Sequence, residues 1–102
     1  MAVLHITSDN FNEVIAGGKT VLIDFFADWC GPCRMMSPVI EEIASERGDI
    51  VVGKINVDEE PELAGRFGVM SIPTLVVMKN GEAVNRATGA RPKAAVLALL
   101  EG

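Results

Sequence analysis

Residues 29–33 read WCGPC and contain both cysteines of the chain, Cys30 and Cys33. Two thiols at this spacing can bind a metal, attach haem, close a structural loop or exchange electrons as a dithiol–disulfide pair. A structural zinc site usually needs four ligands, and the only histidine is the distant His5. A metal shared between two chains stays open. Covalent haem attachment needs a histidine directly after the second cysteine, but that position holds Arg34.

A purely structural disulfide is the next alternative. It would close a short loop, for which the loop-entropy estimate is only about 2 kcal/mol, and Gly31 and Pro32 already restrict that loop. Redox exchange fits better, because Cys30 follows an apolar, strand-like run and precedes a helical pattern. The free N–H groups and the dipole at a helix N-terminus favour a thiolate. We therefore predict that Cys30 is the exposed, attacking thiol and that a recessed Cys33 resolves the mixed disulfide.

The sequence around the pair predicts alternating strands and helices. Ser8 and Asp9 are capping residues before a short helix, Pro38 should kink the helix that follows the cysteines, and Asn80–Gly81 predicts a tight hairpin turn. Strands are predicted at residues 2–7, 20–27 and 50–57, a hairpin at 74–88, and helices at 8–18, 33–47, 59–69 and 91–102. This order predicts parallel strands with crossover helices, to which the hairpin adds antiparallel strands.

Composition limits the class of protein. The 102 residues predict a single domain, residues 1–102, and with 49% apolar residues the chain can bury a core. A net charge of −5 with scattered basic residues argues against nucleic-acid binding. No apolar stretch is long enough to span a bilayer, and the N-terminal residues lack the pattern of a secretory signal. Two cysteines are too few for a secreted disulfide framework, so we expect the cytoplasm.

These segments resemble the thioredoxin family over essentially the whole chain. The matching stretches are FFADWCGPCR, KINVDE, SIPTLVVMKNGE and ATGA. WCGPC is the active-site sequence of that family, and its combination with the downstream residues 72–74 is very specific. The resemblance implies an α/β thioredoxin fold, with a central five-stranded mixed sheet flanked by four helices. It also implies a protein disulfide reductase and dithiol electron carrier that needs no bound cofactor or metal.

Two charged residues in apolar runs are candidates for proton handling. Asp24 interrupts the run at residues 21–26, and burial there would raise its pKa toward the working range. The resemblance implies that Asp24 lies beneath Cys33 and assists its deprotonation, with Lys54 nearby. The alternatives are an exposed Asp24 and a Lys54 whose amine simply reaches solvent along its stem.

The resemblance also implies an apolar surface around the cysteines that receives extended protein segments. Its expected residues are Trp29, Gly31, Pro32, Ser71, Ile72, Pro73, Gly89 and Ala90. A cis bond before Pro73 is implied as well, although trans is the ordinary state of such bonds. Two positions depart from the family pattern: Phe26 stands where many members have a second tryptophan, and Ser71 stands where glycine is common. The serine could narrow the substrate groove.

The partners implied by the resemblance are a thioredoxin reductase and protein substrates with labile disulfides, such as reductive biosynthetic enzymes or peroxidases. We expect a monomer that binds neither nucleic acid nor membrane. Two other functions stay open. A binding module would use the apolar surface and leave the thiols idle. An oxidase or isomerase would need an oxidising compartment, and Gly31–Pro32 between the cysteines resembles the reducing members more closely.

Overall fold

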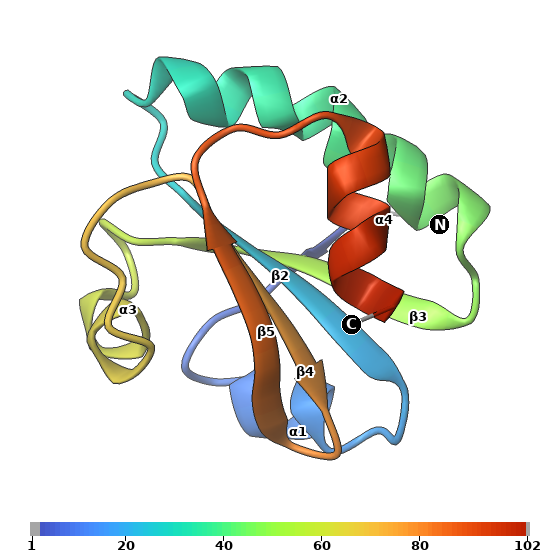
Figure 1. Cartoon of the computed structure of the whole chain (residues 1–102). Coiled ribbons are helices and arrows are strands. Elements are labelled where there is room, and N and C mark those ends of the chain that lie inside the picture. Colours follow the sequence, from blue (N-terminus) through green and yellow to red (C-terminus); the bar gives the residue numbers. More distant parts are fainter. Residues whose placement is uncertain (1–2, 102) are drawn as a thin grey trace.

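The molecule is built around a five-stranded sheet with helices on both faces (Figure 1). The computed structural model describes residues 3–101, so Ala2 of the predicted first strand and Gly102 of the predicted last helix lie outside it. The elements are β1 (Leu4–His5), α1 (Phe11–Ile15), β2 (Thr20–Phe26), α2 (Gly31–Glu46), β3 (Ile50–Asn56), α3 (Pro61–Arg66), β4 (Thr74–Lys79), β5 (Glu82–Thr88) and α4 (Lys93–Glu101). The predicted order and the α/β class are confirmed.

The strand order across the sheet is β1-β3-β2-β4-β5. β3 runs parallel to β1 and β2, whereas β4 runs antiparallel to both β2 and β5, so the sheet is mixed as predicted. Because β2 and β3 are parallel, the segments that follow them leave the sheet at the same edge. The Val57 N–H donates to the Phe26 carbonyl at 2.8 Å, and this bond joins the two segments where the cysteine loop begins.

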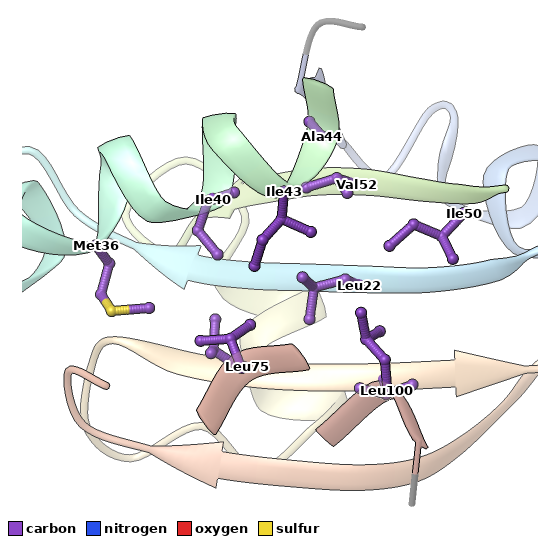
Figure 2. Packing of buried hydrophobic residues seen from close by; sticks show 11 residues of the cluster. Leu22, Met36, Ile40, Ile43, Ala44, Ile50, Val52, Leu75 and Leu100 are labelled. Atoms are coloured by element: carbon purple, nitrogen blue, oxygen red, sulfur yellow. The ribbon is translucent and has the colours of Figure 1, made fainter. Parts of the chain in front are cut away.

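Side chains of β2 alternate between the two faces of the sheet. Leu22 belongs to the cluster that α2 and α4 cover, and Figure 2 shows Ile40 and Ile43 pointing toward it from α2. Phe25 belongs to the opposite cluster, which α1 and α3 cover. With this period of two, Asp24 lies on the same face as Leu22, beneath α2. The alternation therefore sets which helix the carboxylate meets.

The first helix is shorter than predicted, and Ser8 and Asp9 do not cap it. It begins at Phe11, and Asn10 occupies the N-cap position without a side-chain capping bond. The Asn10 side chain instead accepts a hydrogen bond from the Thr7 N–H at 2.8 Å. The Thr7 carbonyl in turn accepts from the N–H groups of Asn10 and Phe11. This turn ties up the polar residues before the helix, so the helix starts only at the first buried side chain.

Helix α2 begins at Gly31 rather than at Cys33. Pro32 fits its first turn because the N–H that proline lacks would be unpaired there in any case. Cys30 is the N-cap residue, and Pro38 lies inside the helix. Within residues 3–101, no helix combines the length and apolar character that crossing a membrane requires.

Two backbone positions depend on special conformations or close approach. Asn80 and Gly81 both have positive φ, 54° and 79°, as a tight hairpin turn between β4 and β5 requires. Gly53 pairs with β1, and a Cβ atom at this position would lie 2.8 Å from Cγ1 of Ile6 and closer still to its Cδ1. The absence of a side chain at Gly53 thus lets Ile6 close over β3.

Candidate active site

The two cysteines form a disulfide at the start of α2, with their Cα atoms 5.3 Å apart. As the N-cap residue, Cys30 presents its sulfur to the first turn, where the Cys33 N–H donates to it at 3.2 Å. A helix N-terminus carries partial positive charge, and an N–H aimed at sulfur stabilises a thiolate. This position supports Cys30 as the sulfur that carries negative charge after reduction.

The difference in exposure that is predicted for the two thiols is not present in the disulfide form. Each is 4% exposed, because the disulfide holds both sulfur atoms in one small apolar cluster with Ala27. They differ instead in what they face. The Cys30 sulfur lies 3.8 Å from the Ile72 carbonyl oxygen, whereas Cys33 lines a hollow that also contains Asp24. The two sulfurs therefore have different surroundings although both are buried.

An apolar groove of about 400 Å³ lies beside Cys30. Its lining residues, which define the apolar groove below, are Trp29, Val57, Val69, Met70, Ser71 and Ile72. Trp29 is 67% exposed and Met70 is 97% exposed, so large apolar side chains face solvent at its rim. Exposed apolar surface next to a reactive pair is typical of a site that binds another molecule.

The predicted surface residues are only partly gathered in this groove. Trp29, Ser71 and Ile72 line it, whereas the others do not. Gly31 and Pro32 are exposed in the first turn of α2. Pro73 is buried and follows a cis peptide bond, as predicted, and its carbonyl accepts from the Gly89 N–H at 2.8 Å. That bond brings Gly89 and the exposed Ala90 next to the segment that carries Ile72.

Asp24 is buried on the face of the sheet beneath α2. It is 5% exposed, and its Oδ1 has no hydrogen-bond partner among residues 3–101. Burial raises the pKa of Asp24 from 3.8 to about 7, and the positive charge of Lys54 partly opposes that rise in pKa. The alternative of an exposed Asp24 is thus excluded. Lys54 pairs with Asp24 in the register of β2 and β3, and its amine lies 5.3 Å from the centre of the Phe26 ring.

Comparison with known proteins gives a consistent result. The thioredoxin family model matches residues 2–102. A thioredoxin from Alicyclobacillus acidocaldarius is 52% identical over 93 residues, which cover 90% of this chain and 89% of that protein. The chain belongs to the thioredoxin family. A thioredoxin from Bacillus subtilis is 48% identical over 101 residues, covering 98% and 96% of the two chains.

A solved structure supports the same assignment. A mutant thioredoxin from Halobacterium salinarum superposes with a TM-score of 0.91 at 40% identity, covering 98% of this chain and 88% of that one. The thioredoxin fold is therefore confirmed. With a redox-active disulfide in the family motif, the chain is a protein disulfide oxidoreductase that acts by thiol–disulfide exchange through Cys30 and Cys33.

The structure also identifies a partner of Trp29 that was not predicted as a site residue. The indole Nε1 donates to Oδ2 of Asp58 at 2.8 Å, which fixes the ring at the rim of the groove. An indole N–H near the surface normally has an acceptor. The parallel pairing of Phe26 with Asn56 puts the residues after β2 beside those after β3. The acidic residue just beyond β3 could have been found from these two facts.

A second hollow region, here called the polar cleft, lies between α2 and the strands below it. It consists of two adjoining hollows of about 330 and 200 Å³, which share Asp24, Ser37 and Lys54. Cys33 lines the smaller one. Ser37 was not predicted, although its spacing of four residues after Cys33 puts both on one side of the helix. Residues 3–101 contain no group of three or more His, Cys, Asp or Glu side chains that could hold a metal ion.

Proposed function

We propose that the chain reduces disulfides in protein substrates, with Cys30 as nucleophile, Cys33 as resolving thiol and Asp24 as the base that serves Cys33. The observation that carries this division of roles is the different surroundings of the two sulfurs. Cys30 lies at the helix N-terminus beside the Ile72 carbonyl, and Cys33 lies on the hollow that contains Asp24. A negatively charged sulfur is thus favoured beside the substrate, and a buried base lies beside the resolving sulfur.

The exchange then has two steps. The Cys30 thiolate attacks one sulfur of the substrate disulfide, so that a mixed disulfide forms and the other substrate sulfur leaves as a thiolate. Asp24 takes the proton of the Cys33 thiol, and the resulting thiolate attacks the Cys30 sulfur. The Cys30–Cys33 bond forms, and the second substrate sulfur leaves with its electron pair. The positive charge of Lys54 keeps the Asp24 carboxylate accessible near neutral pH, because it opposes the rise in pKa that burial causes.

We propose that an extended segment of the substrate lies along the apolar groove. The exposed faces of Trp29 and Met70 support this role, as does the position of the Ile72 carbonyl next to Cys30. The remaining predicted contact residues would meet the same segment at its sides. They are Gly31, Pro32, Ser71, Pro73, Gly89 and Ala90.

Each turnover leaves the disulfide, so a donor of two electrons must restore the dithiol. We propose a thioredoxin reductase as this donor, since one relative from Mycobacterium leprae is a bifunctional thioredoxin reductase/thioredoxin. That relative is 51% identical over 88 residues, which cover 19% of its own length.

Reductive biosynthetic enzymes and peroxidases with labile disulfides are the proposed substrates. We further propose one domain over residues 1–102 that acts as a monomer in the cytoplasm, where thiols stay reduced.

Insulin reduction tests this function. The chain is incubated with insulin and a dithiol, or with a thioredoxin reductase and its reductant, and precipitation of the insulin chains is followed. We expect rapid precipitation with the parent chain and none above background with a Cys30→Ser/Cys33→Ser double variant. A parent chain no faster than the double variant would overturn the reductase function. If a cellular partner bound both forms equally, the chain would act as a binding module.

A further inference from the structure

The polar cleft and the apolar groove open on different parts of the surface. No residue of the described chain lines both of them. A substrate in the groove would cover Trp29 and Ile72 but would leave the cleft uncovered. Cys33 and Asp24 both line the cleft, so the resolving step takes place beside a space that the substrate does not cover. A proton released in that step therefore has a route that does not cross the bound substrate.

Ser37 is the hydroxyl residue that lines both hollows of this cleft, whereas Ser45 lines only the larger one. It lies one helical turn after Cys33, and it lines both hollows together with Asp24. Its hydroxyl has no hydrogen-bond partner within residues 3–101, whereas the hydroxyl of Ser45 on the same helix donates to the Glu41 carbonyl at 3.0 Å. Oδ1 of Asp24 is likewise without a partner in the described chain. The side chains of Asp24 and Ser37 thus line the same two polar hollows.

We propose that Ser37 is a positioning residue that holds a water molecule against Asp24 in the polar cleft, and that the proton taken from Cys33 leaves the protein through this water. The cleft suits water because it is polar and large enough for several molecules. A water there can donate to the Asp24 carboxylate and exchange hydrogen bonds with the Ser37 hydroxyl. This inference rests on the proposed role of Asp24 as the base for Cys33.

The proton and electron balance is that of the resolving step. The Cys33 thiol gives its proton to the Asp24 carboxylate, and its sulfur keeps the electron pair that forms the bond to Cys30. The substrate sulfur leaves with the pair of the broken bond. Asp24 then gives its proton to the water at Ser37, which exchanges it with bulk solvent. The other charged side chains that border the cleft and affect this transfer are Lys54 from β3, Arg34 and Glu41 from α2, and Asp28 from the cysteine loop.

The test separates the two thiol steps. The reduced protein is mixed with 5,5′-dithiobis(2-nitrobenzoate), which releases one coloured thiolate when Cys30 attacks and a second when Cys33 resolves the mixed disulfide. Both phases are measured from about pH 5 to about pH 9 for the parent, Ser37→Ala, Ser37→Thr and the matched control Ser45→Ala. We expect Ser37→Ala to slow the second phase about fivefold, the effect of losing one net hydrogen bond. Its first phase should be unchanged, and Ser37→Thr should retain the parent rate.

Combination with Asp24→Asn decides whether Ser37 acts through the carboxylate. In that background Ser37→Ala should cause no further slowing, because the group that it serves is gone. An equal slowing in both backgrounds, or none in the parent, would overturn the role of Ser37 and leave the proposed function intact. A second phase unaffected by Asp24→Asn itself would instead overturn the proposed base. Chemical denaturation of each variant checks that Ser37, an exposed residue, is replaced without loss of folding.

Discussion

Replacing Asp24 by asparagine should stabilise the oxidised protein increasingly as the pH rises. Burial gives this carboxyl a pKa of about 7 in the folded chain, against 3.8 for an ordinary aspartate. The folded state therefore holds its proton at pH values where the unfolded chain has lost it. Folding is favoured below the lower pKa and is penalised progressively as the pH rises through the higher one. Asparagine has no such charge to bury, so the variant escapes this penalty.

The size of the effect follows from the two pKa values. At a pH well above 7, the penalty on the parent amounts to about 4 kcal/mol, because each tenfold difference in proton affinity corresponds to about 1.4 kcal/mol. Most of it develops between about pH 4 and about pH 7. The Asp24→Asn variant should thus gain about 4 kcal/mol relative to the parent across this range. The buried amide adds its own desolvation cost, which is independent of pH and shifts the whole curve equally.

Urea denaturation of the oxidised proteins, from about pH 4 to about pH 9, measures the difference. The oxidised form is used because a disulfide does not titrate, so Cys33 adds no proton of its own. Asp49→Asn is the matched control. Its hydrogen bond with Arg47 lowers the pKa of the exposed Asp49 to about 2, so both of its states are charged at neutral pH. The control difference should stay nearly flat above about pH 5. If Asp24→Asn loses stability relative to the parent as the pH rises, Asp24 is an ordinary stabilising carboxylate and cannot be the buried base.

Three further predictions concern the cysteines, their reporter and the sheet. Cys33→Ser should trap mixed disulfides with substrate proteins on non-reducing gels and Cys30→Ser should not; the reverse pattern would exchange their roles. Reduction should raise the emission of Trp29, the neighbour of Cys30 in the sequence, because a nearby disulfide quenches indole emission; a spectrum unchanged by dithiothreitol would show that the indole points away from the cysteine pair. Gly53→Ala should cost about 1–3 kcal/mol in urea denaturation, because its methyl group would overlap Ile6; a stability equal to the parent would show that the Ile6 side chain moves aside without cost.

The order of strands and helices could be predicted because the pattern of apolar residues carries it directly. The largely apolar segment at residues 20–27 predicted a strand, and the structure puts β2 in the middle of the sheet. The Asn80–Gly81 turn followed from the positive φ values that such a turn needs. The start of α1 could not be predicted, because Ser8, Asp9 and Asn10 are all capping residues. Which of them meets the helix depends on the turn at Thr7, a contact that a residue pattern does not encode.

The equal burial of the two cysteines could not be predicted from the sequence, for a different reason. A helix N-terminus predicts which thiol is more easily ionised, since that property depends on nearby backbone N–H groups. Exposure depends on how the disulfide packs, and here Ala27 and its neighbours enclose both sulfurs equally. The chemical asymmetry of the pair therefore does not need an asymmetry of exposure in the oxidised state. It can arise from what each sulfur faces: the Ile72 carbonyl for Cys30 and the cleft of Asp24 for Cys33.

The same distinction explains why Asp24 was predicted and Ser37 was not. A carboxylate in an apolar strand conflicts with its surroundings, and such a conflict is visible in the residue pattern alone. A serine on an otherwise amphipathic helix conflicts with nothing, so its role depends on which neighbour the helix turns it toward. Helix α2 places Ser37 on the same hollow as the buried carboxylate of Asp24 and the Cys33 side chain. A residue such as Ser37, whose proposed role causes no conflict in the residue pattern, can thus be identified only once the packing of helix on sheet is known.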